Sequence, residues 1–307
     1  MLRARATLLG RIRHFFAERD VLEVETPLLC SAGVTDPAIE PFVVEQGASL
    51  VAARFLQSSP EYAMKRLLAA GSGPIYQLAR AFRDGEAGGR HNPEFSLLEW
   101  YQPGYDHHRL MGEVAELVQA CLGDKPVQHY SYRALFQQEL GIDPFVAEPA
   151  ALEARAREEL DVGSVSGDRD LWLDLLMSHL IEPVLVGRGL CFVYDYPATQ
   201  AALARVDTVD DVLVGHRFEL YVDGLELANG YWELTDAQEQ RRRFVEDNRR
   251  RRQRGMAERP LDEQLLAAMS AGLPACAGVA LGVDRLLMLR AGCSDIRQTL
   301  AFDWARS

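Results

Sequence analysis

Residues 82–95 read FRDGEAGGRHNPEF, a run of turn-forming residues between two stretches in which apolar and polar residues alternate. The flanking stretches are residues 74–82 (PIYQLARAF) and residues 94–100 (EFSLLEW). Alternation with a period of two is typical of β-strands, and Gly, Asn, Asp and Pro are typical of turns. The sequence therefore predicts a β-hairpin with a tip longer than the roughly two to five residues that close most hairpins.

The tip of this hairpin is charged. Arg83, Arg90 and His91 lie in it beside Asp84 and Glu86. The planar guanidinium group of arginine suits phosphate oxygens, and a carboxylate can meet an adenine edge or a metal ion. A long charged tip is also common in loops that only face solvent. Both interpretations stay open at this point.

The composition is that of an ordinary globular protein. The chain has 307 residues, of which 48% are hydrophobic and 25% charged, enough for one large domain or two smaller ones. It has no run of about 18 apolar residues, so no membrane span is predicted. Residues 1–20 mix apolar and charged residues, which favours an amphipathic helix over a signal peptide. The five cysteines lie far apart with no CxxC pair, which favours reduced thiols in the cytoplasm and argues against a zinc site.

The charge is uneven along the chain. The net charge is −12, which disfavours a general nucleic-acid coat without excluding RNA binding. Eight arginines nevertheless fall within the segment 241–254 of the run QRRRFVEDNRRRRQRG. Such a segment is usually a solvated helix face, although it can also meet an acidic partner.

The remaining pattern predicts helices grouped between hairpin-connected strands. Helices are expected at residues 1–19, 60–70, 107–122 and 236–254, and more of them between 124 and 190. Strands are expected at residues 21–27, 190–196, 216–222 and 225–230, and a strand followed by a helix at 278–289. Asp223–Gly224 predicts a tight hairpin turn. We therefore expect one α+β domain over residues 1–307, a mostly antiparallel β-sheet flanked by helices.

A second candidate site is the stretch GLELANGYWEL, residues 224–234. Glu226 and Glu233 are seven positions apart in it, so a regular strand would point them to opposite faces. A bend near Asn229–Gly230 would bring them together. Converged carboxylates can hold Mg²⁺ or an ammonium group. The alternative is an edge strand with solvated glutamates.

A third candidate site is GVALGVDRLLML, residues 278–289. Small residues at 278, 280 and 282 allow a ligand or another backbone to come close, and Asp284–Arg285 opens a helix. Taken alone, this pattern is shared by many glycine-rich turns. No GxxxxGK[ST] motif is present, which excludes a P-loop. The His107–His108 pair is expected at the surface.

Taken together and in this order, the three motifs resemble those of the class II aminoacyl-tRNA synthetases. FRDGEAGGRHNPEFSLLEWY and LELANGYWEL are closest to the lysyl-tRNA synthetase branch, and the resemblance covers essentially the whole chain. It implies a class II catalytic domain over residues 1–307. No anticodon-binding domain is expected, because the first motif helix begins within the first few residues.

Within that family, SSPEYAMKRLLAAG, ELANGYWELTDAQEQ and GVALGVDRL are similar to truncated paralogues that modify a protein. The resemblance implies that (R)-β-lysine is activated with ATP and passed to a lysine ε-amine of elongation factor P. It also implies a homodimer formed around residues 8–27, and makes tRNA an unexpected partner.

The resemblance further implies roles for single residues. The amino-acid pocket would contain Ser59, Pro60, Glu61, Tyr101 and Glu233. ATP would be bound by Arg83, Asp84, Gly85, Asn92, Glu226, Leu227, Gly282 and Arg285. Mg²⁺ would be held by Glu226 and Glu233. The catalytic groups would be Arg83, which grips the α-phosphate, Arg285, which contacts the γ-phosphate, and Glu226.

Two departures from the family pattern stand out. Asp84-Gly85-Glu86 replaces the usual Asn-Glu-Glu or Asn-Glu-Gly, so the adenine-side glutamate is displaced by one position or replaced by a backbone contact. Ala280 stands where lysyl-tRNA synthetases have glycine, and one added carbon in a pocket discriminates between substrates by about 1–3 kcal/mol.

Two other functions remain compatible with the motifs. One is an enzyme that charges tRNA without an anticodon domain or amidates a small molecule. The other is a non-catalytic amino-acid sensor. The retained Arg83, Glu226 and Arg285 argue against the sensor, which has no need of arginines that grip phosphate.

Overall fold

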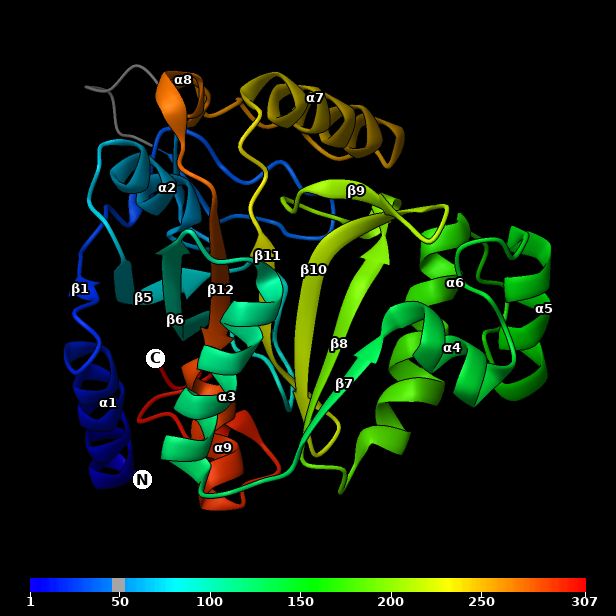
Figure 1. Cartoon of the computed structure of the whole chain (residues 1–307), viewed down its shortest axis with the longest axis horizontal. Coiled ribbons are helices and arrows are strands. Elements are labelled where there is room, and N and C mark those ends of the chain that lie inside the picture. Colours follow the sequence, from blue (N-terminus) through cyan, green and yellow to red (C-terminus); the bar gives the residue numbers. More distant parts are fainter. Residues whose placement is uncertain (46–52) are drawn as a thin grey trace.

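The computed structural model describes residues 1–45 and 53–307. The strands of its main sheet are β1 (Leu22–Glu23), β5 (Ile75–Phe82), β6 (Glu94–Pro103), β7 (Val127–Ser131), β8 (Leu190–Pro197), β9 (Val206–Val209), β10 (Val212–Val222), β11 (Leu225–Trp232) and β12 (Cys276–Gly282). They follow the order β1-β5-β6-β12-β11-β10-β8-β7, and β9 pairs with β10 outside this path (Figure 1). Among the described strands of this sheet, the parallel pairs are β1–β5 and β7–β8. The mostly antiparallel α+β fold is therefore confirmed.

The helices account for most of the remaining chain. They are α1 (Leu2–Ala17), α2 (Glu61–Ala69), α3 (His107–Leu122), α4 (Tyr132–Leu140), α5 (Pro149–Glu159), α6 (Arg169–Leu176), α7 (Ala237–Gln253), α8 (Glu263–Gly272) and α9 (Val283–Ala291). A small second sheet is formed by β2 (Leu29–Cys30), β4 (Arg54–Leu56) and β3 (Val43–Val44). In the described part of the chain, every helix is too short or too polar to cross a bilayer.

One face of the main sheet carries the largest hydrophobic core. Helices α1, α3 and α9 cover this face; in Figure 1, α3 lies in front of the lower part of β12 and α9 continues from the lower end of that strand. Phe16 of α1, Trp100 of β6 and Phe218 of β10 are fully buried in this core. Each such side chain contributes about 2–3 kcal/mol on burial, so this layer holds the sheet rigid behind the opposite face.

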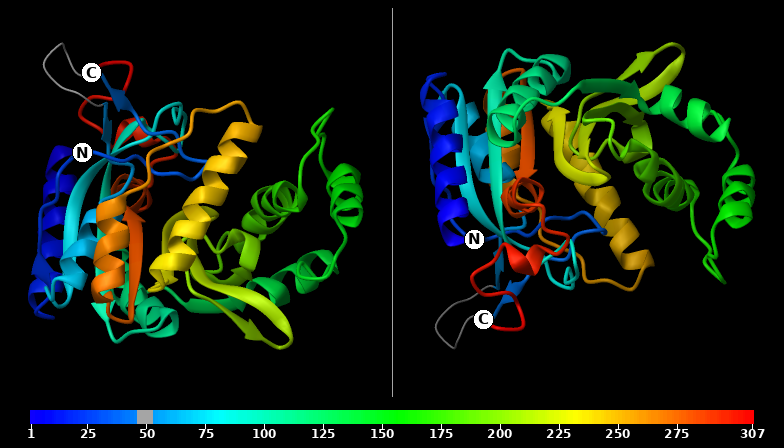
Figure 2. Two further views of the ribbon diagram at one scale, coloured as in Figure 1. Left: turned by 90° about the horizontal axis from the view of Figure 1, so that it is seen from above. Right: turned by 90° about the horizontal axis from the view of Figure 1, so that it is seen from below.

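The opposite face carries two smaller cores. At one end, α2 and α8 pack over Ile75 and Cys276. At the other end, α4, α5 and α6 pack over Val193 and Tyr221. Figure 2 shows these last three helices and α1 at opposite ends of the molecule. Between the two cores, the central strands present small and polar side chains instead of apolar ones, and this gap forms a cleft.

The predicted hairpins are present. β5 and β6 pair antiparallel from Ile75↔Tyr101 to Phe82↔Glu94, so the tip covers residues 83–93. In the β10–β11 turn, Asp223 and Gly224 have φ values of 51° and 71°. Positive φ at both central residues is the requirement of a type I′ turn, which the Asp-Gly pair meets well.

Some boundaries differ from the prediction. The strand expected at residues 21–27 pairs only at Leu22–Glu23, because Pro27 and the chain beyond it turn toward the small sheet. Helix α2 begins at Glu61, directly after Pro60, yet the Ser59 hydroxyl still accepts a hydrogen bond from the Glu61 amide at 3.0 Å. Helix α3 has the predicted bounds, since the Asp106 side chain caps it.

Candidate active site

The cleft on the open face of the sheet has a volume of about 1320 Å³. Its floor is made by three neighbouring strands, in which Ala280 of β12 pairs with Glu99 of β6 and Asn229 of β11. Two residues earlier in β12 and on the same face, Gly278 pairs with Tyr101 of β6 and Tyr231 of β11. Small residues in the central strand thus leave room for a ligand between larger polar side chains on either side.

Packing against neighbouring side chains requires glycine at position 278. A Cβ atom at this position would lie 2.2 Å from Tyr101 Cε1 and 2.5 Å from Glu233 Oε1. Gly282 differs, because the atoms nearest to a Cβ there belong to Arg285, at ordinary distances of 3.6–3.7 Å. Packing within the chain therefore explains the first glycine and does not demand the second.

One end of the cleft is a pocket of carboxylates around a single lysine. Lys65 of α2 is buried, and its Nζ lies 2.6 Å from both Glu61 Oε1 and Glu233 Oε2. Although burial opposes a charged lysine, these two carboxylates raise the Lys65 pKa above its ordinary value. Glu233 Oε1 is buried without a hydrogen-bond partner in the described chain. The pocket therefore retains acceptor capacity for a ligand.

Glu99 adds a further carboxylate to this pocket. Its two oxygens accept hydrogen bonds from Tyr101 Oη at 2.6 Å and Ser59 Oγ at 2.7 Å. Burial and the neighbouring Glu61 charge raise the pKa of Glu99 to about 7. Burial likewise raises the pKa of Glu233 to about 8, against the opposing effect of Lys65. Three carboxylates share one cation here, so the pocket is short of positive charge.

The expected bend in β11 exists at a different place. Tyr221 pairs with Glu226 while Leu220 pairs with Ala228, so Leu227 is an extra residue that forms a β-bulge. The bulge turns Glu226 to the cleft face shared by Asn229 and Glu233. Sequence alone had placed the bend near Asn229–Gly230.

Glu226 and Glu233 do not share one site. They are separated by about 20 Å of strand, and each faces a different cation. Glu233 contacts Lys65, whereas Glu226 Oε2 lies 3.5 Å from Arg285 Nη1. The prediction that both hold one Mg²⁺ is therefore corrected, because its ligands at about 2.0–2.1 Å cannot come from both residues. Burial and the neighbouring Glu219 charge raise the pKa of Glu226. Burial and the Glu226 charge in turn raise the pKa of Glu182 to about 7.

Arg285 connects the strand-helix motif to the hairpin tip. Its Nη1 donates to the Glu226 carbonyl at 2.6 Å, and its Nη2 lies 2.6 Å from His91 Nε2. Burial and the Arg285 charge lower the pKa of His91, so a neutral imidazole faces the guanidinium. The structure thus brings the hairpin tip and the second and third candidate sites together at the other end of the cleft.

Arg83 also lines the cleft, at the start of the hairpin tip. Its guanidinium lies over the Phe95 ring at 5.1 Å and 3.8 Å from Glu86 Oε1. Arg83 Nε is buried without a hydrogen-bond partner in the described chain. An arginine with unused donors facing a cleft can bind an anion.

The structure shows how Asp84-Gly85-Glu86, the departure from the family pattern in the hairpin tip, is arranged. Asp84 and Gly85 are exposed and lie outside the cleft lining, while Glu86 lines it. Gly85 has a φ of 78°, and this left-handed conformation turns the chain so that Glu86 comes back beside Arg83. We therefore expect Glu86, one position later than in the family pattern, to take the adenine side.

The other predicted nucleotide residues, Asn92, Leu227 and Gly282, all line the cleft. The Asn92 carboxamide is already engaged, since its Nδ2 donates to the Glu94 carbonyl at 2.6 Å and its Oδ1 accepts from the Trp304 amide at 3.0 Å. Asn92 therefore anchors the C-terminal segment in this structure. Leu227 is buried beneath the cleft.

Several site residues were missed by the sequence reasoning. Arg217 of β10 lines the cleft, pairs with Glu219, and donates from Nε to Asn229 Oδ1 at 3.3 Å. Glu99 shares a face with Tyr101 two positions later, which is a signal that could have identified it. Lys65 was also missed, and its place four positions after the predicted site residue Glu61 in a predicted helix is a second such signal.

The arginine-rich helix α7 forms one wall of the cleft. Most of its arginines pair with nearby glutamates such as Glu239 and Glu246, as a solvated face would. Arg251 is an exception, because it is fully buried and pairs with Glu40 at 2.6 Å. Arg254, at the end of the helix, lines the cleft.

Comparison with known proteins identifies the family. The model of class II tRNA synthetases (D, K and N) matches residues 1–305. The chain belongs to this family. Relatives from Salmonella typhimurium and Salmonella enteritidis PT4 are 49% identical to it over 303 residues, which is 97% of this chain and 93% of each relative. Both of these relatives are named elongation factor P--(R)-beta-lysine ligase.

Proposed function

We propose that this protein is a ligase that activates (R)-β-lysine with ATP and transfers the β-lysyl group to a lysine ε-amine of elongation factor P. The observation that carries the proposal is the carboxylate pocket around Glu61, Glu99 and Glu233. The similarity to relatives of that name supports the choice of substrate and acceptor.

The pocket suits an amino acid that carries more than one ammonium group. Glu233 Oε1 is a buried acceptor without a partner, and Glu99 and Glu233 are held by burial at raised pKa values of about 7 and about 8. An incoming ammonium would supply the missing positive charge and favour both carboxylates in their ionised form. Ser59 and Tyr101 would keep Glu99 oriented through their hydrogen bonds.

The other end of the cleft suits ATP with Mg²⁺. Arg83 would bind the α-phosphate and Arg285 the γ-phosphate, while Gly282 and Leu227 would lie against the nucleoside. Glu226 would hold Mg²⁺, because it lines the cleft, where burial and the neighbouring Glu219 charge raise its pKa and leave it in need of a cation. Mg²⁺ commonly takes one or two protein carboxylates and completes its shell with phosphate oxygens and water. When bound, it would offset the charge of the phosphates.

The chemistry then requires no nucleophile from the protein. The (R)-β-lysine carboxylate attacks the α-phosphorus, the bond to pyrophosphate breaks, and an aminoacyl-adenylate forms. Arg83 stabilises the negative charge that builds up on the α-phosphate oxygens. The acceptor amine then attacks the adenylate carbonyl, forming an amide and releasing AMP.

We also propose a cytoplasmic homodimer. All five cysteines are free thiols, in keeping with a reducing compartment. Leu22 and Leu29, at and just beyond the 8–27 segment, are 56% and 50% exposed, which supports an apolar contact with a second copy. Leu22→Glu is expected to shift the sedimentation coefficient to that of a monomer, and an unchanged dimer would oppose this contact.

ATP–pyrophosphate exchange tests the proposed activity. Parallel reactions with (R)-β-lysine, (S)-β-lysine and α-lysine should show the fastest exchange with (R)-β-lysine. Exchange that is fastest with α-lysine would favour an enzyme that charges tRNA. ATP binding that does not depend on magnesium, together with no exchange for any lysine, would favour the amino-acid sensor.

A further inference from the structure

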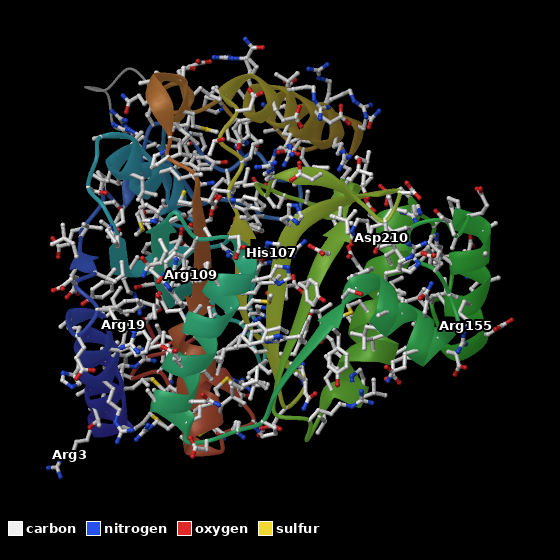
Figure 3. All side chains as sticks on the ribbon, viewed as in Figure 1. Arg3, Arg19, His107, Arg109, Arg155 and Asp210 are labelled. Carbon is white, nitrogen blue, oxygen red and sulfur yellow. The ribbon has the colours of Figure 1, made fainter. Side chains whose placement is uncertain are left out.

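Behind the cleft, on the face of the sheet covered by α3, lies a cluster of His107, Asp195 and His216. His107 is the first residue of α3 and lies beside the central strands (Figure 3). Its Nε2 is 3.2 Å from Asp195 Oδ1, and His216 Nδ1 is 3.1 Å from the same oxygen. Among the described residues, no other set of three His, Cys, Asp or Glu side chains brings possible ligand atoms so close together.

The spacing of these atoms fits one small metal ion. A tetrahedral ion with bonds of about 2.0–2.1 Å places its ligand atoms about 3.3 Å apart. The two edges that meet at Asp195 Oδ1 are 3.2 and 3.1 Å, and all three ligand atoms lie within 4.8 Å of one another. Both histidines are buried, with exposures of 2% and 7%, so an ion would be shielded from most competing water.

A carboxylate outside the triangle orients one of the ligands. His216 Nε2 lies 3.1 Å from Asp207 Oδ2. When the Nε2–H group donates a hydrogen bond to Asp207, the lone pair of Nδ1 is free to bind a metal. This is the arrangement that fixes many metal-binding histidines.

The backbone at Asp195 supports a specific role for its side chain. Gly215 pairs with Tyr196 and Phe218 with Tyr194, so Asp195 lies opposite two residues of β10 in a bulge. Its φ is 59°, a left-handed conformation that is uncommon for residues other than glycine and asparagine or aspartate. In this position the Asp195 carboxylate lies between His107 and His216.

We propose that His107 Nε2, Asp195 Oδ1 and His216 Nδ1 form a zinc site, with a water molecule as the fourth ligand. Imidazole and carboxylate are ligands that Zn²⁺ accepts. The wide spacing of the cysteines argued against zinc in the sequence, but this site needs no cysteine. It would join the start of α3 to β8 and β10. Because His216 is followed by Arg217, it would also fix the strand that presents Arg217 to the cleft.

Calorimetric titration of the full-length, metal-free protein with Zn²⁺ tests this site. The expected result is one equivalent of tightly bound Zn²⁺, with at least 100-fold weaker binding in Asp195→Asn and in His216→Gln. Asparagine tolerates the left-handed backbone, so Asp195→Asn is a fair replacement. Asp207→Asn should weaken binding about 10–100-fold, as expected for a residue that orients a ligand.

His108→Gln is the matched control, because His108 belongs to the same dipeptide but is exposed and lies outside the triangle. It should bind Zn²⁺ as the wild type does. Titration of the wild type with Co²⁺, whose visible absorption reports coordination number, needs no variant and should show a four-coordinate site. The proposal is overturned if the wild type binds neither metal, if Asp195→Asn binds Zn²⁺ with unchanged affinity, or if His108→Gln loses binding.

Discussion

Substitution of Gly278 by alanine is the perturbation for which the structure gives the most definite expectation. The added Cβ would lie 2.2 Å from Tyr101 Cε1 and 2.5 Å from Glu233 Oε1. Both neighbours are only 2% exposed, so neither can swing into solvent. The Tyr101 ring or strand β12 must therefore move by more than about 1 Å to restore an ordinary contact.

Two magnitudes follow from this displacement. Overpacking of a well-packed interior reduces the free energy of unfolding by about 1–3 kcal/mol. A displacement of about 1 Å in a substrate-positioning group can reduce catalytic efficiency on the order of 100-fold. We expect both effects in Gly278→Ala, and we expect the KM for the amino acid to rise while the KM for ATP stays near its wild-type value.

The assay is ATP–pyrophosphate exchange at varied (R)-β-lysine and varied ATP, with urea denaturation for stability. Gly112→Ala is the control, because a Cβ at this position in α3 would meet nothing within 4 Å. Alanine in a helix interior is more favourable than glycine, so this control should be at least as stable as the wild type. A Gly278→Ala variant with wild-type stability and an unchanged KM for (R)-β-lysine would refute the packing argument.

Three further predictions concern the charges of the site. The KM for (R)-β-lysine should fall as pH rises from about 6 to 9. Over this range Glu99 and Glu233, whose pKa values are raised to about 7 and about 8, gain the negative charge that attracts an ammonium group. A KM independent of pH would contradict this prediction. Lys65→Met should reduce the free energy of unfolding, measured by urea titration, on the order of 3 kcal/mol at pH 8 and by less at pH 5. The reason is that the carboxylates left without a cation are neutralised by protonation at low pH. Equal losses at both pH values would oppose the role of Lys65 as the cation of this pocket. Arg83→Ala should lower kcat in pyrophosphate exchange about 100-fold or more. Arg80→Ala breaks a half-exposed pair with Glu94 and a hydrogen bond to the Ser96 hydroxyl on the same hairpin, and it should stay close to wild type. Similar losses in both variants would remove the special role of Arg83.

The parts of the fold that sequence could predict are those fixed by local patterns. The β5–β6 hairpin follows from alternation on both sides of a turn-rich tip, and its pairing from Ile75↔Tyr101 onward agrees with that prediction. Helix α3 has its predicted bounds because Asp106 caps its start and Gly123, with a φ of 88°, follows its end. In both cases, neighbours in the chain determine the structure.

The parts that sequence could not predict depend on distant partners. The bulge at Leu227 is a mismatch of one residue between β11 and β10, and no residue type marks it. The contact between Lys65 and Glu233 joins helix α2 to the residue that follows β11, far along the chain. His107 was expected at the surface, and this prediction was wrong, because Tyr194, His216 and Trp232 pack around its ring. The exposed position predicted for His108 is confirmed.

The most direct test of the proposed function is the mass of purified elongation factor P after incubation with this protein, ATP, Mg²⁺ and (R)-β-lysine. The account predicts that the acceptor gains the mass of one β-lysyl group on a lysine side chain, and that the gain is lost with Arg83→Ala. Active pyrophosphate exchange with an unmodified elongation factor P, and the amino acid attached to tRNA instead, would contradict it.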